Sequence, residues 1–186
     1  MAVEYYFLIS SLPRLALGEA PPWTSADLLD LLAYHLRADD VERVRALEAT
    51  PPVEAFCPAA RRWNETEIFL RNYVVRNRRD TDRRRVEEWT REAPEVFPGL
   101  EPQIDEALNA PNPLERERRL DRIRWQALEE ARFARAFAID AVAVYRLRLI
   151  LVEKWAGVDA EAGLRRVRAL ADELRPHEQL QEAGLA

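Results

Sequence analysis

The side chains that could act as nucleophiles or proton carriers are few in this sequence. Ser10, Ser11 and Cys57 are the nearest to nucleophiles, and His35 and His177 are the two histidines. Serine or cysteine catalysis needs a base within hydrogen-bond reach and a third group that orients the base, and the sequence alone does not place such partners. His35 is interpreted as a residue at the boundary of an amphipathic helix. We predict no catalytic residue.

Metal and nucleotide sites are not expected either. A di-metal bundle needs inward carboxylates with Glu-x-x-His motifs, and no histidine stands at that spacing from the acidic pairs Glu87-Glu88 and Glu129-Glu130. Both pairs are interpreted as solvated helix faces. A phosphate-binding loop needs clustered glycines and a lysine, whereas the chain has five scattered glycines and a single lysine, Lys154. A single cysteine excludes an internal disulfide and a multi-cysteine metal site, so we expect no metal and no cofactor.

Local charge is the strongest interaction signal in the sequence. Residues 61–85 contain nine arginines against four acids, on a chain of net charge −5. Trp63, Phe69 and Tyr73 are interleaved with these arginines and could stack on the bases of single-stranded nucleic acid. The favoured interpretation is that the aromatics face a helical core, which leaves a basic patch for an acidic partner.

A second arginine-rich run occupies residues 115–124, where some charges pair locally, as Glu115 with Arg119 at i,i+4 spacing. The two runs together supply the candidate partner-binding residues. These are Arg61, Arg62, Arg76, Arg78, Arg79, Arg83, Arg84, Arg85, Arg116, Arg118, Arg119 and Arg122.

The elements that must position these residues are predicted to be helices, because glycine is scarce and Ala, Leu, Glu and Arg dominate. The fold class is mostly all-α: a helical bundle in one domain, residues 1–186, with long C-terminal helices. Residues 94–111 are predicted to be an irregular connection with a brief helix near 104–108. Residues 3–10 are aromatic and β-branched, so they fit either an N-terminal strand or a short helix.

Local capping patterns predict where the helices begin. Thr24 followed by Asp27 is an acidic variant of the capping box, which predicts a helix over 25–36. Asn112-Pro113 is the clearest start, with a capping side chain followed by proline at the first helical position. Further starts are predicted at Asp39 with Glu42, at Asn64 with Glu67, near Val86, at Ile139-Asp140 and at Asp159.

The sequence also predicts a soluble cytoplasmic protein without membrane insertion. Residues 1–13 have no basic region before their apolar stretch, unlike a secretory signal. Charged residues, among them Arg135 and Asp140, interrupt the most apolar later stretch, residues 133–152, which excludes an ordinary membrane span. The net negative charge argues against general nucleic-acid binding.

Three segments carry a resemblance to a known family. The opening YYFLISSLP, residues 5–13, the block NPLERERRLDRIRW, residues 112–125, and the pair AVYRL and VEKW, residues 143–147 and 152–155, resemble an uncharacterised family whose genes lie among those of bacterial V-type (A/V-type) ATPases. The resemblance implies a helical accessory protein with no known catalytic residue. Its likeness to the stalk subunit that caps the membrane rotor ring is architectural.

The resemblance and the charged helices together lead to one functional expectation. The chain is expected to be a non-catalytic accessory or stalk-associated subunit, or an assembly factor, of a V-type ATPase or ATP synthase. It would dock on other subunits through its arginine-rich faces and lie peripheral to the membrane through that complex. The alternative is a small nucleic-acid-binding helical module that uses residues 61–85.

Overall fold

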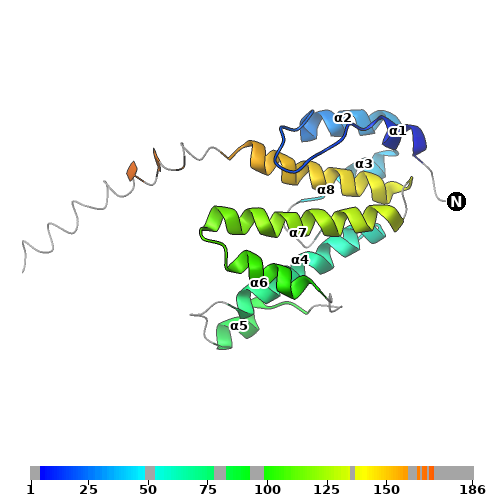
Figure 1. Ribbon diagram of the computed structural model, residues 1–186. Helices are drawn as coiled ribbons and strands as arrows, with labels where there is room; N and C mark the ends of the chain where they lie inside the picture. The colour runs from blue at the N-terminus through cyan, green and yellow to red at the C-terminus, as the bar shows by residue number, and fades with distance from the viewer. Residues whose placement is uncertain are drawn as a thin grey trace, which may run out of the picture. The chain divides into compact units, whose positions relative to one another are not determined.

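The computed structural model describes residues 5–48, 53–77, 83–92, 99–134 and 137–158, together with residues 163, 165, 166, 168 and 169. Every regular element within these residues is an α-helix, and eight helices are defined (Figure 1), which confirms the all-α prediction. The chain divides into two units, Met1–Ala156 and Gly157–Ala186, where one domain was expected. In the second unit the described residues from 163 onward are helical and exposed.

The opening stretch forms a short helix, α1 (Tyr6–Ser11), which decides between the two predicted alternatives. The backbone N–H of Tyr5 donates to the carbonyl of Phe137 at 2.8 Å, and Leu8 is buried. The Tyr5 N–H therefore has its acceptor in the turn before α8 and not in a neighbouring strand.

The next two helices begin at polar positions near those predicted. α2 (Ser25–His35) has the expected capping box: the Asp27 N–H donates to the Thr24 hydroxyl at 3.2 Å, and the Thr24 N–H donates to the Asp27 carboxylate at 2.8 Å. α3 (Ala38–Arg45) begins one residue before Asp39, which therefore lies in the first turn and not at the cap.

The prediction that a helix begins at Asn64 is wrong. α4 (Pro58–Arg76) begins six residues earlier, with proline in its first turn. Asn64 lies inside α4, where its side-chain oxygen accepts from the Val53 N–H at 3.0 Å and its amide donates to the Val53 carbonyl at 2.8 Å. The asparagine satisfies the backbone of a preceding loop, so its partner is too distant in sequence for a local capping pattern to reveal.

The remaining helices are α5 (Arg83–Trp89), α6 (Leu100–Leu108), α7 (Pro113–Ala134) and α8 (Ile139–Ala156). Asn112 caps α7 as predicted, because its side-chain oxygen accepts from the Glu115 N–H at 2.8 Å. The predicted irregular connection, residues 94–111, contains α6, which is longer than the expected brief helix. α8 begins at Ile139, which confirms the start predicted at Ile139-Asp140, but Asp140 lies within the first turn and does not cap the helix.

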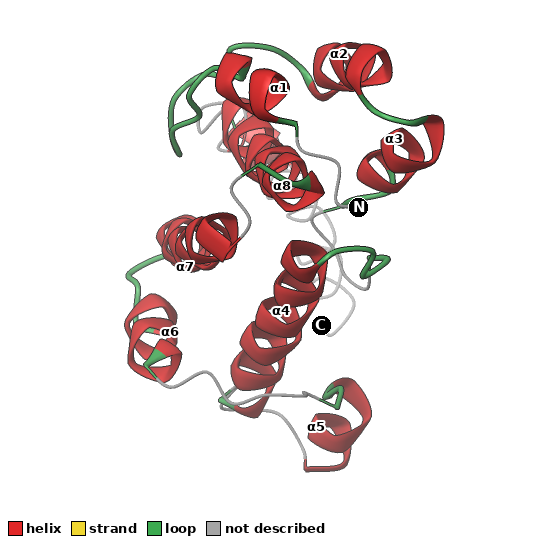
Figure 2. Cartoon of the chain, turned by 90° about the vertical axis from the view of Figure 1, so that its right-hand side faces the viewer, coloured by secondary structure: helices red, strands yellow, loops and turns green. Residues whose placement is uncertain are grey.

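α8 lies in the middle of the first unit. It contacts α2 and α3 on one side and α4 and α7 on the other, and Figures 1 and 2 show this order. Its side chains are buried around most of the circumference, as those of Val142, Val144 and Leu149 show. A second core cluster joins α4, α6 and α7 through Leu70, Ile104, Ala107, Leu120 and Ile123.

Candidate functional site

Five charged side chains and one indole, from three helices, form a connected group where α4, α7 and α8 meet. We call this group the charge network. It consists of Glu67 on α4, of Glu117, Asp121 and Arg124 on α7, and of Lys154 and Trp155 on α8.

Arg124 is the centre of the charge network. Its Nε donates to Glu67 Oε1 at 2.5 Å and its Nη2 approaches Glu67 Oε2 at 3.4 Å, while its Nη1 donates to Asp121 at 2.6 Å and to Glu117 at 3.1 Å. Burial alone would lower the pKa of Arg124, but the charge and hydrogen bonds of Glu67, with those of the other two carboxylates, raise it above its ordinary value. The Glu67 and Asp121 side chains are completely buried, and pairing offsets their desolvation.

Asp121 and Lys154 join α7 to α8. Asp121 Oδ2 accepts from Lys154 Nζ and from Trp155 Nε1, both at 2.7 Å, and Lys154 also donates to Glu117 at 2.6 Å. Burial tends to raise the pKa of Glu117, but the hydrogen bond from Lys154 and the charges of Arg124 and Lys154 outweigh it, so this pKa lies below its usual range. The network therefore connects α7 to α8 through residues of two of the sequence blocks, 112–125 and 152–155, on which the family resemblance rests.

Some arginines of the second predicted run contact other helices of the chain, and others have exposed side chains without a described partner. Arg118 lies over the Trp155 ring, 5.4 Å from its centroid, and Arg119 donates to the Glu106 carbonyl of α6 at 3.0 Å. Arg116 and Arg122 are exposed, and among the described residues neither side chain has a hydrogen bond or an ion pair. Part of this run thus holds helices together, and part is available to a partner.

The members of the first predicted run whose side chains the structure describes are spread along α4. Arg61 and Arg76 are exposed at the two ends of α4, about 22 Å apart at 1.5 Å per residue, and Arg62 is half-buried. Arg78 and Arg79 lie outside the described residues. The side chains of Arg83, Arg84 and Arg85, all in α5, are likewise not among those described.

The aromatic residues of this first run face inward, as the favoured interpretation predicted. Trp63 is 2% exposed, and Phe69 and Tyr73 pack against the second core cluster. The Tyr73 hydroxyl donates to Asp105 at 2.9 Å, which joins α4 to α6. These rings do not line a groove where nucleic-acid bases could stack.

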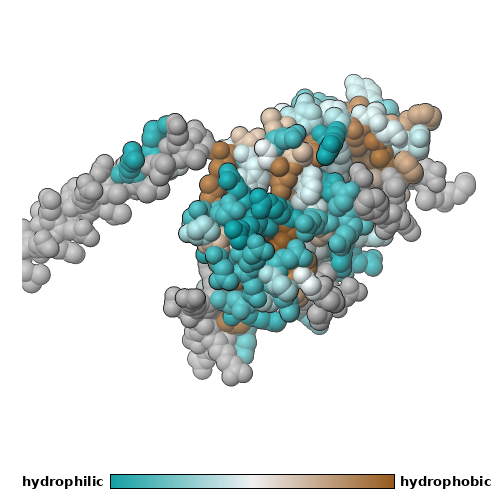
Figure 3. Space-filling view, in the orientation of Figure 1, coloured by the Kyte–Doolittle hydropathy of each residue, from teal (hydrophilic) through white to brown (hydrophobic). Residues whose placement is uncertain are grey.

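The structure also shows an exposed aromatic cluster that the sequence analysis missed. Tyr6, Phe7 and Phe137 are 54%, 86% and 42% exposed, and the Tyr6 ring centroid lies 4.8 Å from that of Phe137. In Figure 3, hydrophobic side chains appear at the end of the molecule that carries α1, while hydrophilic ones gather over α6 and α7. Consecutive residues of a helix point in different directions, and α1 buries Leu8 on one side while Tyr6 and Phe7 lie on its exposed side.

The groups first considered for catalysis differ in environment, and His177 lies outside the described residues. Cys57 is buried, His35 is exposed, and the Ser11 hydroxyl donates to the Leu8 carbonyl at 2.7 Å. Within the described residues, no group of three or more His, Cys, Asp or Glu side chains is placed so that it could hold a metal ion. Within the described ranges, no helix has both the length and the apolar character to cross a bilayer.

The fold and the charge network define an α-helical protein in which a group of charged side chains joins three helices. Residues 90–177 match the model of a family described as "Protein of unknown function (DUF2764)". No curated protein and no solved structure matches the chain. The match supports the expected likeness to an uncharacterised family, and it includes every member of the charge network except Glu67.

Proposed function

We propose that this protein is a non-catalytic accessory or stalk-associated subunit, or an assembly factor, of a V-type ATPase or ATP synthase, and that it acts by protein–protein contact. The observation that carries the proposal is the exposed pair Arg116 and Arg122, for which the described residues supply no ionic partner. On a chain of net charge −5, such a local basic surface attracts an acidic partner. The resemblance of residues 112–125 to the ATPase-associated family supplies the identity of the complex.

The position of these arginines supports a role in contact. Arg116 stands at the end of the first turn of α7, where the helix dipole gives a cation no stabilisation. At 100° per residue, Arg116, Arg118, Arg119 and Arg122 fall on an arc of about 160° of the helix surface. Arg116 and Arg122, whose side chains are unpaired among the described residues, lie about 120° apart around the helix and about 9 Å apart along it, so that one partner surface can meet both.

The nucleic-acid alternative is the weaker of the two. It requires aromatic rings beside the cations for stacking, and Trp63, Phe69 and Tyr73 face the core. Phosphate binding by exposed arginines alone would weaken steeply as salt is raised. Binding to single-stranded DNA or RNA at low salt with such a dependence would favour this alternative.

Purification of the native ATPase complex from the source organism tests the proposal. The chain should be recovered in a fixed ratio to the other subunits. The double variant Arg116→Glu with Arg122→Glu should lower this recovery at least about tenfold, because like charges pressed together cost on the order of several kcal/mol. Arg37→Glu, at an exposed arginine outside α7, is the matched control. Absence of the chain from both the complex and its assembly intermediates would refute the proposal.

A further inference from the structure

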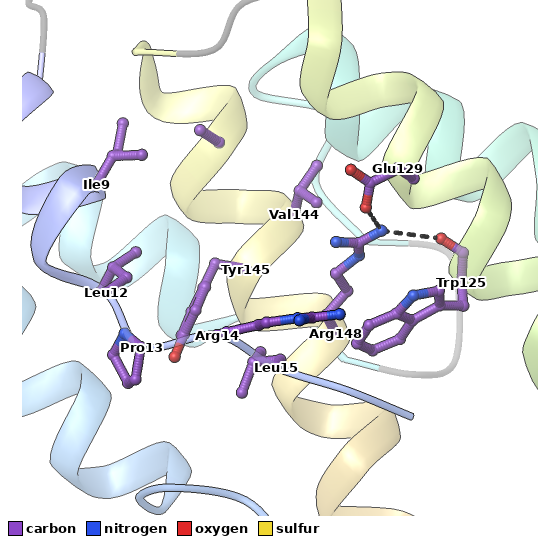
Figure 4. A pocket seen from close by; sticks show the side chains of 11 residues that line it. Ile9, Leu12, Pro13, Arg14, Leu15, Trp125, Glu129, Val144, Tyr145 and Arg148 are labelled. Atoms are coloured by element: carbon purple, nitrogen blue, oxygen red, sulfur yellow. Dashed lines mark hydrogen bonds and ion pairs between the residues drawn. The ribbon is translucent and has the colours of Figure 1, made fainter. Parts of the chain in front are cut away.

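A pocket of about 480 Å³ lies between the end of α1 with its following loop, α7 and α8. Its walls come from Ile9 and residues 12–15, from Tyr145 and Arg148 on α8, and from Trp125 and Glu129 on α7 (Figure 4). This volume falls in the range of about 300–1,000 Å³ that small-molecule sites occupy. The pocket is separate from the arginines of α7 on which the proposed function rests.

The walls of the pocket combine an apolar surface with two guanidinium groups and one carboxylate. Leu12, Leu15 and Val144 supply apolar surface. Arg14 and Arg148 supply the guanidinium groups, and the carboxylate is that of Glu129, which pairs with Arg148. The ring of Tyr145 completes one wall. Burial raises the pKa of Tyr145 to about 12, so its phenol is neutral and does not balance the charge of the arginines.

The two guanidinium groups differ in burial and in pairing. Arg148 is nearly buried: it lies 4.3 Å from the Trp125 ring centroid, donates to the Trp125 carbonyl at 3.3 Å and pairs with Glu129. Arg14 is exposed and, within the described residues, makes no hydrogen bond or ion pair. In Figure 4 its side chain extends across the pocket from the side of Tyr145 toward that of Trp125.

We propose that this pocket binds a carboxylate that is attached to an apolar or aromatic group. Arg14 supplies the ion pair, since a guanidinium matches a carboxylate with two parallel N–H donors. The apolar part of the ligand rests against Leu12, Leu15 and Val144. Because Glu129 already balances the charge of Arg148, the pocket presents one uncompensated positive charge, which suits a monoanion better than a phosphate dianion.

Two sources share this ligand chemistry, a free aromatic acid and the C-terminal residue of a polypeptide. Phenylacetate represents the first, and an N-acetylated dipeptide that ends in phenylalanine with a free carboxylate represents the second. Phenylacetamide and the C-amidated dipeptide are the matched neutral controls. Binding to the full chain is followed by NMR, through the indole N–H signal of Trp125 in the pocket wall.

At least one of the two carboxylates should shift this signal saturably, and its neutral amide should bind at least about tenfold more weakly, because charge-assisted hydrogen bonds are roughly twice as strong as neutral ones. Arg14→Ala should reduce the affinity by a similar factor without affecting the fold, since Arg14 is exposed. Arg37→Ala, at an exposed arginine outside the pocket, should change nothing. Glu129→Gln should tighten binding several-fold by releasing the Arg148 guanidinium.

Three results would overturn the inference: no saturable shift with either carboxylate at millimolar concentration, equal binding of the amides, or unchanged affinity in Arg14→Ala. Binding of phenylacetate alone identifies a free acid as the ligand, and binding of the dipeptide alone identifies a polypeptide terminus. None of these results depends on whether the chain associates with an ATPase.

Discussion

Asp140, in the first turn of α8, accepts a hydrogen bond from the backbone N–H of Ala59, at the start of α4, at 3.0 Å. A carboxylate of one helix thus satisfies a free backbone donor of another. At the other end of α8, Glu153 accepts from the Ser25 N–H at 2.6 Å at the start of α2. The central helix therefore holds the N-termini of two of its neighbours through side chains placed near its own ends.

Removing the first of these carboxylates should destabilise the protein. Asp140→Ala leaves the Ala59 N–H without its acceptor in a buried position, so we expect the free energy of unfolding to fall by about 1–2 kcal/mol. Urea denaturation followed by circular dichroism measures the change. Asp39→Ala, in the exposed first turn of α3, is the control and should lose much less; equal losses would contradict the capping role.

Loss of Asp121 should have the largest effect in the charge network. Asp121→Ala removes the acceptor shared by Arg124, Lys154 and Trp155, and breaking a buried ion pair costs roughly 3–5 kcal/mol. Equilibrium unfolding in urea should show this loss. Glu115→Ala, which removes one partially exposed i,i+4 partner of Arg119, should cost only about 0.5 kcal/mol.

The stability that Glu117 provides should depend on pH. Since its pKa is lowered in the folded protein, its contribution is complete above the ordinary value of about 4.3 and is lost as the pH falls through the lowered pKa. Glu117→Gln should therefore melt at a lower temperature than the unmodified protein at neutral pH. The two melting temperatures should converge in acid.

Calorimetry across this pH range tests the dependence on Glu117. Glu19→Gln, at an exposed carboxylate outside the charge network, alters the formal charge equally and serves as the reference. A difference in melting temperature between Glu117→Gln and the unmodified protein that stays constant down to strong acid would contradict the prediction.

The tether between Asn64 and Val53 offers a test of a long-range contact. Asn64→Ala removes both hydrogen bonds to the Val53 backbone, so we expect a loss of about 1–3 kcal/mol. Asn64→Asp keeps the acceptor and removes the donor, and should lose less. Hydrogen exchange at the Val53 amide should quicken in the alanine variant, and unchanged exchange would contradict the assignment.

The parts of the fold that were predicted from sequence depend on contacts between near neighbours. Thr24 caps α2 with Asp27, and Asn112 caps α7 through the Glu115 N–H; both partners lie within three residues, so the pattern is visible in the sequence. Asn64 and Asp140 are also of residue types that commonly cap helices, but their partners lie 11 and 81 positions away. Only the packing of the helices determines such pairs.

The candidate contact residues were predicted from their charge, and charge does not show toward which neighbour a side chain points. Arg119 and Arg124 belong to one arginine-rich run, yet Arg124 turns toward Glu67 on α4 and Arg119 toward α6. Glu67 was interpreted as part of a helix start and is instead a completely buried partner. The pocket beside Arg14 brings together residues more than 100 positions apart, and no periodic pattern contains that information.

Lys154, the one lysine of the chain, is held between Glu117 and Asp121. Amine-directed reagents therefore find a single side chain to modify, and modifying it would neutralise a cation that joins α7 to α8. A cross-linking map based on lysine chemistry would record almost none of the neighbours of this protein. Reagents that couple to carboxylates or arginines, or photoreactive groups placed on α7, are the appropriate means of capturing its partners.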